Sequence, residues 1–210
     1  LDLVEGRHKG ELIQKLSSRL GRENVKKVVI DMSGTYRGFI KDFFPSAEIV
    51  ADKFHVLRLL NPMINKLRKE ITGDKRTNPI RRLLLKSGHR LKYFERNALH
   101  AWLKEHKHLE LVYQFKESLS RFYRLKCAKK AERVLTNLTD QLAMFEHYKE
   151  LKTLRKTLKN WRTEILNYFI HRITNGRTEG FNNKLSLVKR RAFGYRSFEN
   201  YRLRALNACL

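Results

Sequence analysis

Two short apolar runs that each end in an aspartate constrain the fold of this chain more than any other feature. Residues 25–32 contain the run "VVIDM" with Asp31, and residues 48–51 are followed by Asp52. The segment 33–45 between them, which opens on a serine and closes on a proline, has helical character. A strand, a helix and a strand in this order form a right-handed unit with parallel strands. Both aspartates are therefore predicted at the carboxyl edge of a sheet, where α/β proteins bind ligands.

The residues before this unit extend the same alternation. Residues 1–5 are typical of the end of a strand, and a helical segment over 6–20 follows, with Gly21 as its stop. The first 55 residues thus predict strand, helix, strand, helix and strand, which is an α/β pattern. Because the chain opens inside a strand, we expect an N-terminal portion upstream of Leu1.

From Val56 onward the pattern is helical almost to the end. Residues 55–71 predict one amphipathic helix with a kink near Pro62, and residues 97–126 predict a long helical stretch with a break near 105–108. We therefore expect three regions in the chain. These are part of a strand-bearing core over 1–55, a helical insertion over 56–172, and C-terminal helices of the core over 173–210.

The charge balance indicates the kind of partner. Lysine and arginine number 46 against 21 acidic residues, a net charge of +25. Such an excess destabilises the compact state by self-repulsion and favours a polyanionic partner such as DNA or RNA. Cys127 and Cys209 are too few for a disulfide framework or a zinc site and fit a reduced cytoplasmic setting. No apolar run approaches the ~18 residues that a membrane span needs.

Three acidic residues stand where phosphoryl-transfer chemistry could use them. Two Mg²⁺ ions can cut and join phosphodiesters, and hard carboxylate ligands from separate elements hold such ions. Asp31 and Asp52 end predicted strands, and Glu179 lies at the start of a predicted helix that follows the helical insertion. Taken alone, an aspartate after an apolar run is more often a turn or cap residue than a metal ligand. The combination of the three residues points to metal-dependent chemistry.

Two long blocks of the sequence resemble a known family. The blocks "VVIDMSGTYRGFIKDFFPSAEIVADKFHVLRLLN" and "NGRTEGFNNKLSLVKRRAFGYRSFENYRLRAL" are similar to the catalytic domain of bacterial insertion-sequence transposases of the ISL3 group. These are DDE enzymes with a ribonuclease H-like fold. The resemblance implies an α/β fold class, a partial ribonuclease H-like sheet whose first strands lie upstream, and a large all-α insertion.

The resemblance also implies an Asp-Asp-Glu triad that binds Mg²⁺ or Mn²⁺. Asp31 matches the second aspartate and Glu179 the glutamate, and the first aspartate is expected upstream, since Asp2 is a poor substitute. In this alignment Asp52 and His55 either position DNA or hydrogen-bond to the metal ligands and orient them. Asn182, beside Glu179, is given the same kind of supporting role. An alternative alignment makes Asp31 and Asp52 the two aspartates.

Further residues near Glu179 are candidates for DNA contact. They combine cations, amides and an aromatic ring, a mixture that suits phosphate contacts with base stacking. This group consists of Arg177, Asn183, Lys184, Lys189, Arg190, Arg191 and Tyr195. We expect Phe193 and Phe198, in contrast, to pack in the core.

By resemblance, the chain is predicted to be the catalytic fragment of a transposase that cuts and joins DNA strands. Its expected partners are transposon ends and target DNA, with a homo-oligomer forming on DNA, no membrane partner, and a location at the bacterial nucleoid. Two alternatives stay open at this point. One is a DNA-binding remnant without catalysis, and the other is a helical RNA-binding module.

Overall fold

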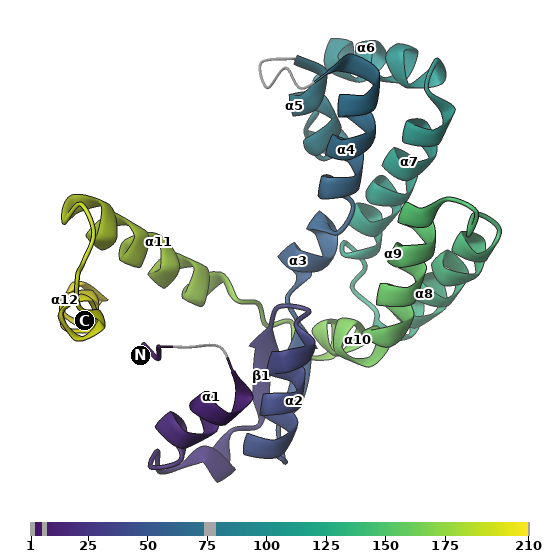
Figure 1. The fold of residues 1–210 in the computed structure, drawn as a ribbon. Coiled ribbons are helices and arrows are strands. Elements are labelled where there is room, and N and C mark those ends of the chain that lie inside the picture. The colour runs from purple at the N-terminus through teal and green to yellow at the C-terminus, as the bar shows by residue number, and fades with distance from the viewer. Residues whose placement is uncertain (1–2, 6–7, 74–78, 210) are drawn as a thin grey trace. The chain divides into compact units, whose positions relative to one another are not determined.

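The computed structural model describes residues 3–5, 8–73 and 79–209, and the chain divides into two compact units (Figure 1). The sheet unit comprises Leu1–Asp52 and Ile173–Leu210, and the helical unit comprises Lys53–Arg172. The two junctions lie near the predicted boundaries at 55/56 and 172/173. The assignment of these regions as domains of a larger core stays a prediction.

The sheet unit contains the predicted strand–helix–strand arrangement. Strand β1 (Lys27–Ile30) pairs in parallel with β2 (Glu48–Ala51), and helix α2 (Gly34–Phe43) connects them. Beta-branched residues make up three of the four positions of β1 and two of the four positions of β2, while α2 presents Phe39, Ile40 and Phe43 to the interior. The sequence prediction of two parallel strands around one helix is confirmed.

The N-terminal residues differ from the prediction. Helix α1 spans Lys9–Leu16, which is shorter than the helical segment predicted over 6–20, and Gly21 follows with a φ of 78°. Residues 3–5 form no strand, and residues 1–2, including Asp2, lie outside the described residues. The prediction of a strand over 1–5 is wrong for its described part. A strand requires a hydrogen-bonded neighbour, and within the described residues β1 pairs only with β2.

The described part of the helical unit contains helices joined by turns and irregular connections, and no strand. Short 3₁₀ turns cover Arg22–Asn24 in the sheet unit and Gly88–Arg90 in the helical unit. The helices of the helical unit are α3 (Lys53–Arg58), α4 (Asn61–Thr72), α5 (Pro79–Leu85), α6 (Tyr93–Lys104), α7 (Lys107–Phe122), α8 (Ala128–Ala143), α9 (Lys149–Asn160) and α10 (Arg162–His171). In the part of the chain that the structure describes, no helix has the length and apolarity that a membrane span requires.

Two breaks between helices of this unit can be compared with the sequence predictions. Between α6 and α7 the chain leaves the helix at Glu105, so the predicted break near 105–108 is confirmed. At Pro62, however, the predicted kink is wrong, because the chain forms two separate helices there. Pro62 occupies the first turn of α4, where the missing N–H removes no helical hydrogen bond.

Two helices close the chain and pack on each other within the sheet unit (Figure 1). Helix α11 (Gly176–Arg191) buries Leu185, and helix α12 (Phe198–Cys209) buries Ala205. Phe193, between them, is fully exposed and has a φ of 52°, so the prediction that it packs in the core is wrong. The left-handed backbone at Phe193 lies in a short connection where the ring remains in solvent.

Candidate metal centre

The pairing of the two strands brings Asp31 and Asp52 to adjacent positions. Ile30 is the register partner of Ala51, and the backbone N–H of Asp52 donates to the carbonyl of Ile30 at 2.9 Å. The ladder therefore continues one residue past β2. Because the strands are parallel, both aspartates leave the sheet at the same edge.

The two aspartates differ in their exposure to solvent. Asp52 is 1% exposed, directly after three buried residues of β2, whereas Asp31 is half-buried. After Asp31 the chain turns sharply, since the N–H of Ser33 donates to the Asp31 carbonyl at 2.6 Å before α2 begins. A buried carboxylate is unfavourable unless hydrogen bonds or a cation compensate its charge.

A third potential ligand follows in the next turn of the chain. His55 lies in α3, three residues beyond Asp52, and is exposed. One ligand atom from each of Asp31, Asp52 and His55 can be chosen so that all three lie within 4.8 Å of one another. The alternative alignment predicts the pairing of Asp31 and Asp52, but His55 is predicted only to position DNA or to support the metal ligands, so its place among the potential ligands was missed.

The donors of this cluster fit a divalent cation. Two carboxylates supply the hard oxygen ligands that Mg²⁺ and Mn²⁺ prefer, and an imidazole is more suitable for Mn²⁺ than for Mg²⁺. Asp31, Asp52 and His55 would hold the ion, with water filling the remaining positions. Single carboxylate and imidazole ligands leave open coordination positions, which a catalytic metal needs.

The start of α11 is tied to the same sheet edge. The backbone N–H of Asn175 donates to Oδ1 of Asp52 at 3.3 Å, and Asn175 is the residue that precedes the first turn of α11. This contact gives the buried Asp52 carboxylate a donor at the positive end of a helix dipole. Sequence reasoning missed Asn175, because nothing local marks a contact between residues that lie 123 positions apart.

Glu179 lies one helical turn beyond this contact. Its N–H donates to the Asn175 carbonyl at 2.9 Å, which places it in the first turn of α11. Its side chain is exposed, and among the described residues it is not a member of the cluster of Asp31, Asp52 and His55. Its assignment as a metal ligand with Asp31 therefore stays a prediction.

The polar residues that follow on α11 face solvent. Asn182, Asn183 and Lys184 are all exposed, three to five residues after Glu179. Asn182 and Asn183 share a face of the helix with Glu179 because of this spacing. Arg177 is exposed with its guanidinium 5.8 Å from the Phe181 ring centroid. These side chains are available to a ligand, and their roles stay predictions.

The last turn of α11 carries the remaining candidates for DNA contact. Lys189, Arg190 and Arg191 are exposed, and cations at a helix C-terminus also offset its dipole. Tyr195 is half-buried with its ring 5.3 Å from that of Tyr201. A hollow of about 660 Å³ is lined by Val188, Arg191, Ala192, Tyr195, Arg204, Asn207 and Ala208. Arg204 thus joins two predicted residues, a grouping that the sequence pattern did not indicate.

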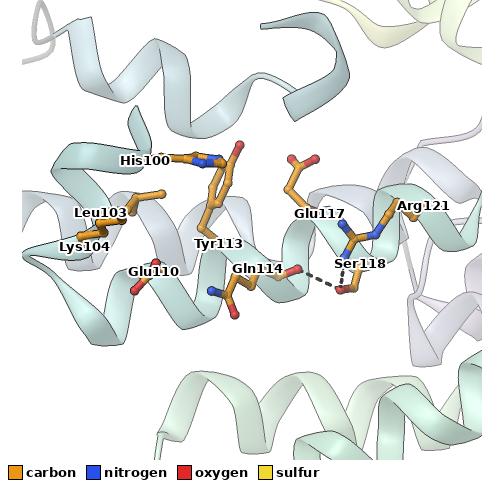
Figure 2. A pocket seen from close by; sticks show the side chains of 9 residues that line it. All are labelled: His100, Leu103, Lys104, Glu110, Tyr113, Gln114, Glu117, Ser118 and Arg121. Atoms are coloured by element: carbon orange, nitrogen blue, oxygen red, sulfur yellow. Dashed lines mark hydrogen bonds between the residues drawn. The ribbon is translucent and has the colours of Figure 1, made fainter. Parts of the chain in front are cut away.

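A different hollow lies in the helical unit beside α6 and α7. Figure 2 shows its lining, with the His100 ring on α6 extending towards Tyr113 on α7. Its volume is about 470 Å³. The carboxylate of Glu117 is already engaged by the N–H of Gly88 at 3.0 Å and by Lys116 Nζ at 2.9 Å. None of the candidate metal ligands lines this hollow, so it adds nothing to the chemistry of the strand-end cluster.

Paired strand-end carboxylates in a chain with a net charge of +25 are typical of proteins that process nucleic acid with divalent metals. Comparison with known families narrows this class. A family model for DDE-type, ISL3 transposases, described as "Transposase", matches residues 1–205. The chain therefore belongs to the ISL3 family of DDE transposases, and the family resemblance predicted from the two sequence blocks is confirmed.

Two known proteins show how much of this chain, and how much of each relative, the similarity covers. The chain is 29% identical over 191 residues to the "Transposase for insertion sequence element IS1001" of Bordetella parapertussis, and the alignment covers 87% of this chain and 47% of that protein. The chain thus spans about half the length of this relative. A 69-residue stretch is 33% identical to an "ATP-dependent protease" of Lactococcus lactis subsp. lactis, covering 33% of this chain and 21% of that protein. No solved structure matches the chain.

Proposed function

We propose that this chain is the catalytic part of a transposase, with a ribonuclease H-like core that cuts and joins DNA strands. The observation that carries this proposal is the adjacency of Asp31 and Asp52, together with the bond from Asn175 that fixes the start of α11 to the same edge. The strand pairing supplies carboxylates from two strands, and the Asn175 bond holds the start of α11, which carries Glu179, at the same sheet edge. Family membership supports the same reading.

In this proposal Asp31 and Glu179 are the metal ligands, and Asp52 is a third candidate. A bound Mg²⁺ or Mn²⁺ pair would activate a water or a 3′-hydroxyl and stabilise the leaving oxygen. Asp52 contributes a buried negative charge whose orientation the Asn175 N–H fixes. His55 either completes the ligand set or orients a carboxylate from the next turn.

The DNA partner follows from charge and from the family. A net charge of +25 favours a polyanionic partner, because such a partner reduces the self-repulsion of the chain. The exposed cations of α11 that precede and follow Glu179, Arg177 and Lys184 among them, would hold phosphates next to the metal centre. Asn183 and the Tyr195 ring would contact the sugar–phosphate backbone or a base.

The alternative is a DNA-binding remnant that keeps the basic surface without a working triad. A nicking assay with supercoiled DNA and Mg²⁺ or Mn²⁺ separates the two proposals. The parent protein should nick DNA, and Asp31→Asn and Glu179→Gln in that protein should each abolish nicking while DNA binding is retained. Binding without metal-dependent nicking by the parent would favour the remnant, and equal nicking by all three proteins would overturn the catalytic assignment.

A further inference from the structure

The solvent face of α9 carries a row of four lysines. The helix has the sequence KELKTLRKTLKN, in which Lys149, Lys152, Lys156 and Lys159 recur at intervals of three or four residues. This spacing places them on one face of the helix, and all four are exposed. We refer to these four residues as the α9 lysine row.

The opposite face of α9 is buried against the rest of the helical unit and holds the α9 lysine row in place. Leu151, Leu154 and Leu158 are at most 1% exposed, and α9 packs along α8 (Figure 1). Arg155 adds a polar link to α8, since its Nε donates to the Thr139 carbonyl at 2.9 Å. The lysines therefore project from a preorganised helical hairpin.

The acidic residues closest in sequence to the row are engaged elsewhere. Glu150 lies 3.5 Å from Nε2 of His108, and Glu146 pairs with Arg155 at 2.6 Å. Within the described ranges, none of the four lysines forms an ion pair. The only arginine of α9 thus serves the fold, while its row of lysines leaves four positive charges uncompensated.

The positive charge continues beyond the end of α9. Arg162, three residues after Lys159, lines a hollow of about 560 Å³. Lys129 and Arg133 of α8 line the same hollow, together with Glu132, which pairs with Arg162 at 3.0 Å. Three cations and one carboxylate leave this hollow positive as well.

The surroundings of the row favour DNA over a membrane surface. An amphipathic helix that lies on a membrane inserts its apolar face into lipid, but the leucines of α9 are buried against the protein. The exposed neighbours on the row's face are Thr153 and Asn160, which suit a polar contact. The row runs about 15 Å along the helix, and a DNA strand presents one phosphate per ~3.4 Å of duplex axis.

We propose that the α9 lysine row, continued by the cations of the α8–α10 hollow, binds the phosphate backbone of duplex DNA. The proposal rests on the proposed function, because it assigns a second surface for the same DNA partner. It goes beyond that function, because the candidates for phosphate and base contact between Arg177 and Tyr195 lie on or next to α11, and none lies on α8, α9 or α10. The contact is to phosphate and is independent of base sequence.

Binding of the full 210-residue chain to a random-sequence duplex, measured by fluorescence anisotropy in EDTA over a range of salt, tests this proposal. The double variant Lys152→Gln/Lys156→Gln removes two charges from the row. The matched control Lys66→Gln/Lys104→Gln removes two exposed charges from α4 and α6. Loss of two phosphate contacts should lower the salt slope by about 2 and the affinity roughly 60-fold at 0.1 M salt. The control should change both quantities far less.

Each outcome bears on a different claim. If the parent fails to bind DNA, the proposed function loses its partner. If the parent binds and the row variant matches the control, only the row is overturned, and Lys149→Gln/Lys159→Gln should then match the control too. The row is also overturned if the row variant loses binding to anionic phosphatidylglycerol vesicles but keeps its DNA affinity. Thermal unfolding of every variant shows whether the helical unit remains folded.

Discussion

The backbone N–H of Asn175 donates to Oδ1 of Asp52 at 3.3 Å, although 123 positions separate the two residues. The helical unit lies between them in the sequence, so this bond closes the sheet unit across its two segments. Asp52 is almost completely buried and needs such a donor. The contact therefore links the stability of the sheet edge to the placement of α11.

Replacing Asn175 by proline should remove this donor with little backbone conflict. The φ of Asn175 is −81°, which proline can adopt. Loss of a hydrogen bond to a carboxylate should cost about 1.5 to 3 kcal/mol, measured by urea unfolding of the sheet unit. Asn175→Ala is the matched control, since the Asn175 side chain makes no cap hydrogen bond. Equal stability of the two variants would show that the bond contributes nothing.

A divalent cation should stabilise the folded chain through the strand-end cluster. A ligand that binds only the folded state adds about 2.7 kcal/mol at a concentration 100 times its Kd. Mn²⁺ should therefore raise the Tm of the parent, and Asp31→Asn should abolish this rise. Asp140→Asn, which removes an exposed carboxylate from α8, should keep it.

The same titration distinguishes the two assignments of the triad. If Glu179 is a ligand together with Asp31, Glu179→Gln should reduce the Mn²⁺-dependent rise in Tm as well. If Asp31 and Asp52 hold the ion with His55 alone, Asp52→Asn and His55→Ala should reduce it and Glu179→Gln should not. A rise that persists in Asp31→Asn would place the ion elsewhere in the chain.

The helical unit should lose stability in acid through Glu95. Its carboxylate accepts hydrogen bonds from Lys86 Nζ at 2.8 Å, from the Lys92 N–H at 2.9 Å and from Arg82 at 3.0 Å. The Lys86 hydrogen bond, then that of Lys92, lowers the pKa of Glu95 below its ordinary value of 4.5. Just below pH 4.5 the unfolded chain therefore binds more protons than the folded one, so stability falls as the pH falls through the folded pKa.

The variant Glu95→Gln isolates this contribution to acid sensitivity. Above pH 4.5 it should be less stable than the parent, and the difference should shrink as acid protonates Glu95 in the parent. Urea unfolding followed at several pH values between about 6 and about 3 measures this difference. Glu105→Gln, an exposed carboxylate at the end of the same helix, should leave the profile unchanged. Parallel profiles for parent and Glu95→Gln would refute the role of Glu95.

Local patterns sufficed to predict the strand–helix–strand unit. Beta-branched residues before Asp31, helical spacing in the next segment and apolar residues before Asp52 each specify their element over a few positions. A parallel pair then follows from the handedness of the connection. The adjacency of the two aspartates could therefore be inferred, because it depends only on short-range signals.

Other features depend on contacts that no local pattern contains. The bond between Asn175 and Asp52 forms across the whole helical unit. Just before Pro62 the chain breaks into α3 and α4, but the apolar spacing in the sequence continues across the break. It does so because each of these helices buries apolar residues along one face. Phe193 is predicted to pack in the core with the terminal helix, but its backbone is left-handed and its side chain is fully exposed.

The α9 lysine row should reduce the stability of the helical unit in the absence of DNA. Lys156 lies four residues after Lys152 and three before Lys159, and like charges at these spacings each destabilise a helix by about 0.2 to 0.5 kcal/mol. Lys156→Gln should therefore stabilise the unit by about 0.4 to 1 kcal/mol, since both residues have similar helix propensity. Urea unfolding at low ionic strength measures the gain.

Salt and a matched variant test the origin of this gain. In 1 M salt the Debye length falls to about 3 Å, so the advantage of Lys156→Gln should nearly vanish. Lys66→Gln on α4 removes a lysine that has Glu70 four residues later, and it should give no gain at either ionic strength. A loss of stability in Lys156→Gln would show that this lysine serves the fold. Stabilisation together with weaker DNA binding would instead show that the row is retained for its partner at the expense of the fold.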